Sequence, residues 1–265
     1  AKEAAEKFGA QSVATDSTEV VQRDDIDALS IVTPNHLHAE ISIAAIEAGK
    51  HVFCEKPMAL SVSEADRMIN DSDRAGVILR VYENFVFYPP HVLAKALIEA
   101  GEIGRPQRLR MHFGNGMSET EWKVPLSSWL WRINETKCGG GPLIFDHGYH
   151  LFSLARYLMG EVERVYAWMD SSPVGGGIPR RVAEVDAPAT IMFQFKEPRR
   201  YGVLVFTHTP DMVLDRIYSA DYDRLEVIGD RGILLINRCT ARTLDLPPLM
   251  LFRDGKTTEV PIDRF

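Results

Sequence analysis

The segment DALSIVTPNHLHAEISIAAIEAGKHVFC, residues 27–54, decides the fold of this chain. It opens with a short apolar run, residues 27–33, which is typical of a strand buried on both faces. Residues 36–48 then gather apolar side chains on one helical face, and Gly49 ends that helix. Residues 51–54 form a second apolar strand. The order strand, helix, strand predicts a βαβ unit with parallel strands.

The same alternation continues toward the C-terminus. Ser61 with Glu64 three residues later is a capping box, which predicts a helix to about Ala75 that Gly76 ends. Residues 77–82 read as a third strand. Repeated βαβ units predict an α/β domain with a parallel sheet and helices on both faces.

The pattern changes after Asn84, and we expect two domains, residues 1–85 and 86–265. A helix is predicted from Pro89 to Ala100 and another over about 143–159. One helix followed by many strands predicts an α+β domain with an antiparallel sheet. Strand-like runs are 106–114, 161–169, 187–196, 201–208, 223–228, 233–237 and 249–253, with a hairpin turn at 229–232.

Composition excludes several classes of protein. The 265 residues are 45% hydrophobic and 25% charged, with a formal charge of −7 and no Lys/Arg cluster for a nucleic acid. No apolar stretch approaches the roughly 20 residues that cross a bilayer. No charged segment followed by an apolar run opens the chain, so we expect no signal peptide. Cys54, Cys138 and Cys239 are scattered, which argues against a disulfide scaffold. We therefore expect a soluble cytoplasmic protein that binds neither nucleic acid nor membrane.

Two polar segments follow the first two predicted strands of the parallel sheet. TPNHLH, residues 33–38, and Glu55-Lys56-Pro57 both lie where ligands of open α/β sheets bind. Pro57 biases the backbone of Lys56 toward extended geometry. This restricts the direction in which the Lys56 side chain leaves the backbone. Alternatives stay open: Asn35 also suits a helix N-cap, and Glu55 with Lys56 could be a surface ion pair.

A third segment is GGGPLIFDHGYH, residues 139–150. Asp146 and His150 are four residues apart on the predicted helix, so we expect their side chains to be neighbours. A carboxylate beside an imidazole fixes its tautomer and raises its basicity. Gly148 costs helix stability, about 1 kcal/mol against Ala, which suggests that something approaches closely there. A purely structural Asp–His pair is the alternative.

Aromatic and cationic side chains precede the glycines of this third segment. Trp129 and Trp131 offer flat apolar surfaces, and Arg132 suits a hydroxyl-rich or anionic ligand. An interface or lid patch is the alternative.

Other chemistries have less support. A metal site would need Asp146, His147 and His150 to converge with His36 or His38, and no third ligand spacing supports it. We therefore expect no metal. A serine elbow and an activated cysteine are absent from the sequence pattern.

Four segments in this order resemble the Gfo/Idh/MocA (glucose–fructose oxidoreductase / inositol dehydrogenase) oxidoreductase family. They are Thr33-Pro34-Asn35-x-x-His38, AGKHVFCEKP at 48–57, Gly101-Glu102-Ile103-Gly104, and the glycine triplet with Asp146-x-Gly148-x-His150. The similarity runs through nearly the whole chain. It implies an incomplete Rossmann-type domain over 1–85, followed by an α+β substrate-binding and oligomerisation domain over 86–265 with a large, mostly antiparallel open sheet.

The resemblance also implies an activity: hydride transfer between NAD or NADP and a hydroxyl of a sugar, inositol or related polyol. Lys56 would contact the reacting hydroxyl and the nicotinamide ribose, His150 would be the general base, and Asp146 would orient His150. The residues implied to bind the cofactor are Thr33, Pro34, Asn35, His38, Glu55, Lys56 and Pro57. Those expected to contact the substrate are Asn84, Trp131, Arg132 and His147.

Partners and alternatives follow from the same resemblance. The open sheet of the family commonly mediates assembly, so we expect a homodimer or homotetramer through the strands after residue 161. An NAD-dependent glycoside hydrolase of the same family and a non-catalytic binding or assembly protein stay open as alternatives. Neither the substrate nor the choice of NAD or NADP follows from the sequence.

The chain departs from the family pattern at both ends. It has no Gly-x-Gly-x-x-Gly loop, which in the family holds the pyrophosphate, and it stops at Phe265 soon after a strand-like run. We therefore expect an internal fragment of a longer protein, inactive or weak in cofactor binding by itself.

Overall fold

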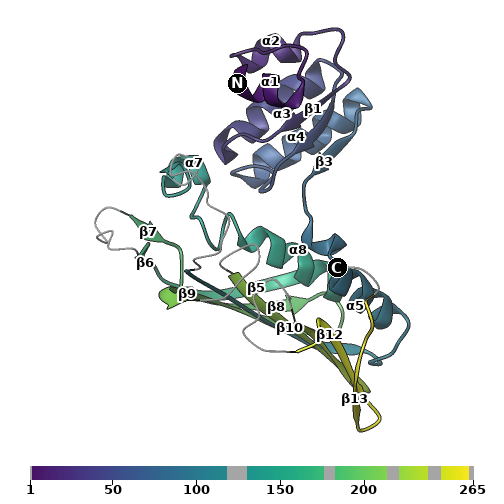
Figure 1. Ribbon diagram of the computed structural model, residues 1–265. Coiled ribbons are helices and arrows are strands. Elements are labelled where there is room, and N and C mark those ends of the chain that lie inside the picture. The colour runs from purple at the N-terminus through teal and green to yellow at the C-terminus, as the bar shows by residue number, and fades with distance from the viewer. Residues whose placement is uncertain (1, 118–129, 176–182, 214–220, 238–245, 263–265) are drawn as a thin grey trace. The chain divides into compact units, whose positions relative to one another are not determined.

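A computed structural model describes residues 2–117, 130–175, 183–213, 221–237 and 246–262 (Figure 1). The chain divides into two compact units. Unit 1 comprises residues 1–82 with 135–139, and unit 2 comprises residues 83–134 with 140–265.

Unit 1 contains a parallel sheet of three strands in the order β1 (Ala28–Ile31), β2 (His51–Cys54) and β3 (Leu79–Val81). The 3₁₀ helix η1 (Asn35–Leu37) and helix α3 (His38–Glu47) connect β1 to β2, and α4 (Val62–Ala75) connects β2 to β3. Helices α1 (Lys2–Phe8) and α2 (Ser17–Val21) precede them. The predicted parallel βαβ units are confirmed.

The capping box of α4 is confirmed in detail. The Ser61 hydroxyl accepts the Glu64 N–H at 3.2 Å, and the Glu64 carboxylate accepts the Ser61 N–H at 3.1 Å. Gly76 ends the helix in the left-handed region, with φ 67°.

The sequence predicts helices on both faces of this sheet. The described helices instead pack on one face only. Helices α3 and α4 pack against each other, and the buried residues Ile31, Val52 and Cys54 share one core with residues of both helices. Ser30 and Phe53, which point to the other face, are exposed. Two right-handed crossovers in the same direction place both helices on one face, which explains the difference.

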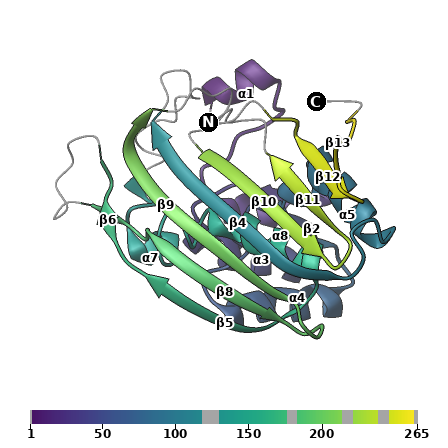
Figure 2. The same ribbon diagram turned by 90° about the horizontal axis from the view of Figure 1, so that it is seen from below.

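Unit 2 is built on an eight-stranded sheet with the order β13-β12-β11-β10-β4-β9-β8-β5 (Figure 2). Its neighbouring strands are antiparallel except for the parallel pair β4–β9. The bounds are β4 (Pro106–Met117), β5 (Val162–Met169), β8 (Ala189–Phe195), β9 (Tyr201–Val213), β10 (Asp221–Gly229), β11 (Gly232–Asn237), β12 (Leu249–Arg253) and β13 (Lys256–Glu259). The predicted, mostly antiparallel sheet is confirmed, as is the turn between Gly229 and Gly232.

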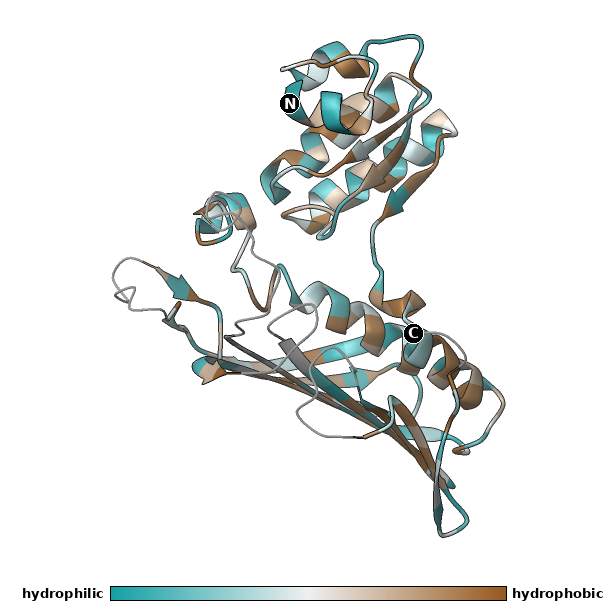
Figure 3. Cartoon of the chain, viewed as in Figure 1, coloured by the Kyte–Doolittle hydropathy of each residue, from teal (hydrophilic) through white to brown (hydrophobic). Residues whose placement is uncertain are grey.

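Two α-helices and a short 3₁₀ helix cover one face of this sheet: η2 (Phe85–Phe87), α5 (Pro89–Glu99) and α8 (Gly148–Met159). Leu151 and Leu154 of α8 are buried in one core with Phe113 and Phe206 of the strands. Figure 3 shows this apolar layer in brown along the sheet and the helices. Burial of each such side chain stabilises the fold by about 1.5–3 kcal/mol.

The opposite face of the large sheet carries exposed apolar side chains, mainly on the edge strand β5. Tyr166 and Trp168 point to this face and, with Met192 opposite Tyr166 on β8, form what we call the β5 patch; Trp168 is 59% exposed. The rings of Tyr166 and Trp168 are in contact, with centroids 4.6 Å apart. A short two-stranded sheet, β6 (Ser172–Pro173) with β7 (Glu184–Val185), and helix α7 (Glu135–Cys138) complete the described elements. No helix in the described ranges has the length and apolarity to span a bilayer.

Candidate active site

The side chain of His38 bridges the two loops that follow β1 and β2 in unit 1. Its Nδ1 lies 2.8 Å from the Pro57 carbonyl oxygen, and its Nε2 lies 2.8 Å from the Thr33 carbonyl oxygen. The side chain is fully buried, with no exposed surface. Since the carboxyl ends of adjacent parallel strands share one edge of the sheet, this bridge brings both predicted cofactor segments together at that edge.

The Glu55-Lys56-Pro57 segment is held by the backbone of β1. The Glu55 N–H donates to the Ile31 carbonyl oxygen at 2.9 Å, and the Glu55 carboxylate accepts the Lys56 N–H at 3.1 Å. Lys56 is half-buried, and the Lys56–Pro57 peptide bond is cis. The Glu55 carboxylate therefore contacts the main chain of Lys56. The alternative left open by the sequence was an ion pair between the two side chains.

Two polar atoms near this edge have no hydrogen-bond partner within the described structure. They are the buried Oγ1 of Thr33 and the buried Nδ1 of His36. Buried polar groups are normally paired, so unpaired ones at a sheet edge fit a polar ligand. Asn35 does not act as the predicted alternative N-cap: it lies inside η1, and its side chain donates to the Cys138 carbonyl oxygen of α7 at 2.9 Å.

Cys54 ends β2 and is fully buried. Burial raises the pKa of its thiol to about 11, so the thiolate form is scarce at neutral pH. Cys54 is therefore a core residue and not an activated nucleophile.

In unit 2, Glu83 contacts one ring nitrogen of His150, and Phe85 stacks on the face of its imidazole. Both carboxylate oxygens of Glu83 lie 3.0 Å from His150 Nδ1. The Phe85 ring stacks on the imidazole at 4.2 Å between centroids and 9° between planes. The Phe85 N–H donates to the Glu83 carboxylate at 2.7 Å, which fixes this carboxylate in turn. Nε2 of His150 has no hydrogen-bond partner among the described residues.

Asp146 is not the partner of His150, which corrects the sequence prediction. Its carboxylate accepts from Nε of Arg132 at 3.2 Å, and the Arg132 guanidinium lies 4.3 Å from the centre of the Trp131 ring. The helix predicted over 143–159 begins only at Gly148, so Asp146 precedes it and the four-residue helical spacing does not apply. The carboxylate at His150 comes instead from Glu83, 67 positions away in the sequence.

Asp186 is the reason that residues 142–147 form turns instead of a helix. Its carboxylate accepts the N–H groups of Leu143, Ile144 and Phe145 at 2.8, 2.7 and 3.0 Å. A Cβ at Gly141 would lie 2.1 Å from the Asp186 Cγ, so this carboxylate requires glycine there. Asp186 therefore anchors the turn that leads into α8 and His150.

Gly148 packs against the aromatic core. A Cβ on this residue would lie 3.2 Å from the Phe152 ring and 3.4 Å from the Phe206 ring. The close approach predicted from the helix glycine is thus correct, and its cause is packing.

The remaining predicted substrate residues lie near this region of unit 2. Asn84 is exposed and follows Glu83 directly. The ring of His147 lies 4.5 Å from Phe113 and 5.5 Å from His150, measured between centroids. Trp131 and Arg132 are half-buried. Trp129 lies outside the described residues.

Sequence reasoning missed Glu83 and Asp186. Glu83 directly follows the predicted third strand, which is a signal of position, yet no spacing rule links it to His150. Asp186 lies between two short strands with no motif around it. Among the described residues, no three His, Cys, Asp or Glu side chains form a group that could hold a metal ion.

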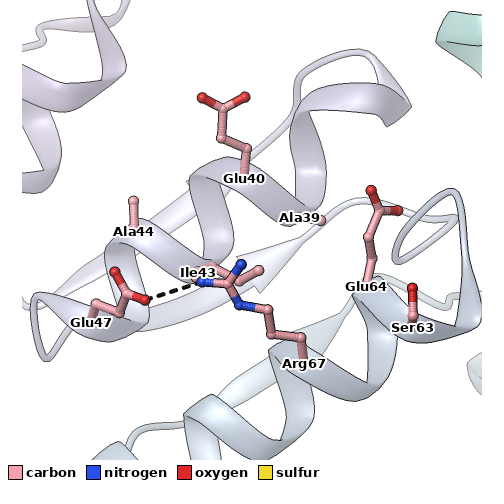
Figure 4. Close-up of a pocket in the computed structure, with 8 residues that line it drawn as sticks. All are labelled: Ala39, Glu40, Ile43, Ala44, Glu47, Ser63, Glu64 and Arg67. Atoms are coloured by element: carbon pink, nitrogen blue, oxygen red, sulfur yellow. Dashed lines mark hydrogen bonds and ion pairs between the residues drawn. The ribbon is translucent and has the colours of Figure 1, made fainter.

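A groove between α3 and α4 is separate from all of these residues (Figure 4). It is lined by Ala39, Glu40, Ile43, Ala44, Glu47, Ser63, Glu64 and Arg67. Arg67 pairs with Glu47 at 3.4 Å, and Glu64 is committed to the capping box. None of the predicted site residues lines this groove.

Comparison with known proteins defines the class. Residues 1–83 match the family described as "Oxidoreductase family, NAD-binding Rossmann fold". Residues 91–235 match the "GFO/IDH/MocA C-terminal domain". The chain belongs to the GFO/IDH/MocA oxidoreductase family.

Two relatives and one solved structure indicate the range of similarity. The chain is 35% identical over 212 residues to levoglucosan dehydrogenase of Pseudarthrobacter phenanthrenivorans, covering 74% of this chain and 53% of that protein. It is 31% identical over 246 residues to myo-inositol 2-dehydrogenase of Thermotoga maritima, covering 92% and 66%. A structure of levoglucosan dehydrogenase with NADH and levoglucosan superposes with a TM-score of 0.76 at 30% identity, covering 98% and 68%. The chain thus spans about half to two thirds of the length of these relatives.

Proposed function

We propose that this protein is an NAD(P)-dependent dehydrogenase that transfers a hydride between the nicotinamide and a hydroxyl of a sugar, inositol or related polyol. The observation that carries the proposal is the buried imidazole of His150, which is 7% exposed and has one nitrogen engaged by a carboxylate. Only Nε2 remains to take a proton, as a general base requires. The named activities of the similar levoglucosan and inositol dehydrogenases support the substrate class.

The cofactor segment consists of Thr33, Pro34, Asn35, His38, Glu55, Lys56 and Pro57. The unpartnered Thr33 Oγ1 and His36 Nδ1 support a polar ligand at this edge of the sheet. The contacts of His38 with the Thr33 and Pro57 carbonyl oxygens hold the two loops of the cofactor segment together. When bound, the nicotinamide ring supplies the hydride acceptor.

The catalytic roles fall to two side chains. His150 removes the hydroxyl proton through Nε2 as the hydride leaves the carbon. Lys56 contacts the reacting hydroxyl and stabilises the negative charge that develops on its oxygen. The Asp146 carboxylate pairs with Arg132 at 3.2 Å and orients its guanidinium toward a hydroxyl-rich substrate.

Substrate contacts are assigned to Asn84, Trp131, Arg132 and His147. The guanidinium of Arg132 lies over the indole ring of Trp131. The guanidinium can donate to the hydroxyls of a sugar or cyclitol, and the indole can pack on its apolar face.

We further propose a cytoplasmic homo-oligomer whose subunits associate through the open face of the large sheet. The exposed β5 patch supports the interface, since large contiguous apolar surfaces mark association sites. The free thiols of Cys54 and Cys138 support a reducing compartment.

A substrate screen tests the proposal. The protein, purified at its full natural length, is incubated with sugars, inositols and anhydrosugars in the presence of NAD⁺ or NADP⁺, and both reduced nicotinamide and products are measured. We expect reduction of the nicotinamide with a ketone product, and a loss of turnover by orders of magnitude in Lys56→Ala. Release of a free sugar without net reduction would favour a glycoside hydrolase, and no conversion of any polyol would contradict the proposal.

A further inference from the structure

We infer that Glu83 is the positioning residue of the site: it holds His150 in the tautomer with the proton on Nδ1 and leaves Nε2 as the basic nitrogen. This inference rests on the proposed function for its catalytic consequence, whereas the tautomer itself is a property of the folded chain.

The first argument is the direction of the hydrogen bond. An ionised carboxylate has lone pairs and no proton to give, so the nitrogen that faces it must carry the hydrogen. Both oxygens of Glu83 lie 3.0 Å from Nδ1 of His150. A neutral imidazole has one N–H, and this contact places it on Nδ1.

The second argument is that Glu83 has no freedom to turn away. Its Oε1 also accepts the Phe85 N–H at 2.7 Å, and its side chain is only 10% exposed. The backbone of Phe85 is itself held, because its carbonyl oxygen lies 2.7 Å from Nδ1 of the buried His91. The carboxylate thus has two N–H partners and a fixed orientation.

The third argument is the clamp on the ring face. Phe85, two residues after Glu83, stacks on the imidazole with an interplanar angle of 9°. One short segment therefore determines both the tilt of the ring and its protonated nitrogen. The carboxylate of Asp146 pairs with Arg132 at 3.2 Å.

Nuclear magnetic resonance on the full chain tests the tautomer without any activity. Histidine is labelled with ¹⁵N, long-range ¹H–¹⁵N correlations show which ring nitrogen carries the proton, and His150→Gln identifies the signal. We expect the proton on Nδ1 in the unaltered chain and a gain of the Nε2-protonated form in Glu83→Ala. The matched carboxylate variant Asp146→Asn is expected to leave the tautomer unchanged.

Turnover supplies the second readout. Glu83→Ala is expected to lower kcat about a hundredfold with KM within about twofold, since the lost element is the orientation of the base. Added formate is expected to restore part of this turnover by occupying the vacated carboxylate position, and to restore none in His150→Ala. Glu83→Gln keeps an oxygen for Phe85 N–H and Nδ1–H but loses the charge, so it is expected to fall only about tenfold.

A proton on Nε2 in the unaltered chain overturns the inference, and this outcome requires no variant to fold. A tautomer that follows Asp146→Asn and not Glu83→Ala also overturns it, as does a failure of formate to raise turnover in Glu83→Ala. If the unaltered protein oxidises no polyol, the proposed function fails, while the tautomer measurement still decides the inference about Glu83.

Discussion

At the scale of single residues, Arg132 and Asp146 form an ion pair of unequal burial. The Asp146 side chain is 6% exposed and that of Arg132 is 29% exposed. Removal of the cation leaves a buried carboxylate with less compensation, which is costly, whereas exposed pairs contribute little.

Arg132→Ala is therefore expected to lower the free energy of unfolding by about 1–3 kcal/mol. Urea unfolding measures this change. The matched control is Arg110→Ala, which breaks the more exposed pair with Glu226 and is expected to cost less than about 0.5 kcal/mol. Equal losses in the two variants would contradict the assigned difference in burial.

Cys54 gives a pH-dependent prediction. Burial raises the pKa of its thiol from the ordinary 9.0 to about 11, so the unfolded thiol ionises at lower pH than the folded one. The stability from this group is present below pH 9 and is lost as the pH rises toward 11. Iodoacetamide at pH 8 should alkylate Cys54 only in unfolded protein, as peptide mapping would show. Rapid alkylation of the native protein would refute the burial of this thiol.

The sequence singles out His150, Lys56 and the loop residues after β1 and β2 as candidates, because their positions follow from strand ends and family motifs. It did not predict the partner of His150. The contact between Glu83 and His150 joins segments 67 positions apart, and no local periodicity reports on such a pair. The wrong partner, Asp146, followed from extending a helix across residues that Asp186 holds in turns.

At the scale of elements, the turn over residues 142–147 sets where α8 begins. Three successive N–H groups that would otherwise lack intrahelical acceptors donate to Asp186. Local propensity predicted the helix itself but not this anchor, since Asp186 lies about forty positions downstream.

Asp186→Ala is expected to free these N–H groups and to lower the free energy of unfolding by about 2 kcal/mol or more. Hydrogen exchange of the amides of Leu143, Ile144 and Phe145 should accelerate strongly. Asp170→Ala is the control, because within the described ranges its carboxylate accepts only the N–H of the adjacent Ser171. Unchanged protection of the three amides in Asp186→Ala would exclude the anchoring role.

At the scale of the whole molecule, the sequence patterns predicted both sheets: the parallel sheet of unit 1 and the mostly antiparallel sheet of unit 2. They could not predict that β4 and β9 pair in parallel, because this contact depends on strand order across about ninety residues. Nor could they predict which sheet faces stay exposed. Apolar residues on β5 look like core in the sequence, yet this strand is at the edge of the sheet and its patch faces solvent in the single chain.

Trp168→Glu is expected to dissociate the proposed oligomer, because a charge in an apolar interface is costly. Light scattering coupled to size exclusion would show a fall in molar mass. Val62→Glu alters an exposed apolar residue in unit 1, 77% exposed, and is expected to leave the mass unchanged. An unaltered oligomer in Trp168→Glu would exclude the β5 patch as the interface.

The central claim is that His150 is the general base of a polyol dehydrogenase, and the rate of nicotinamide reduction by His150→Ala tests it most directly. With saturating polyol and NAD⁺ or NADP⁺, we predict a kcat at least about a hundredfold below that of the unaltered protein. Circular dichroism should show the same fold, and cofactor affinity should be unchanged. Turnover by His150→Ala within a few-fold of the unaltered protein would contradict the claim.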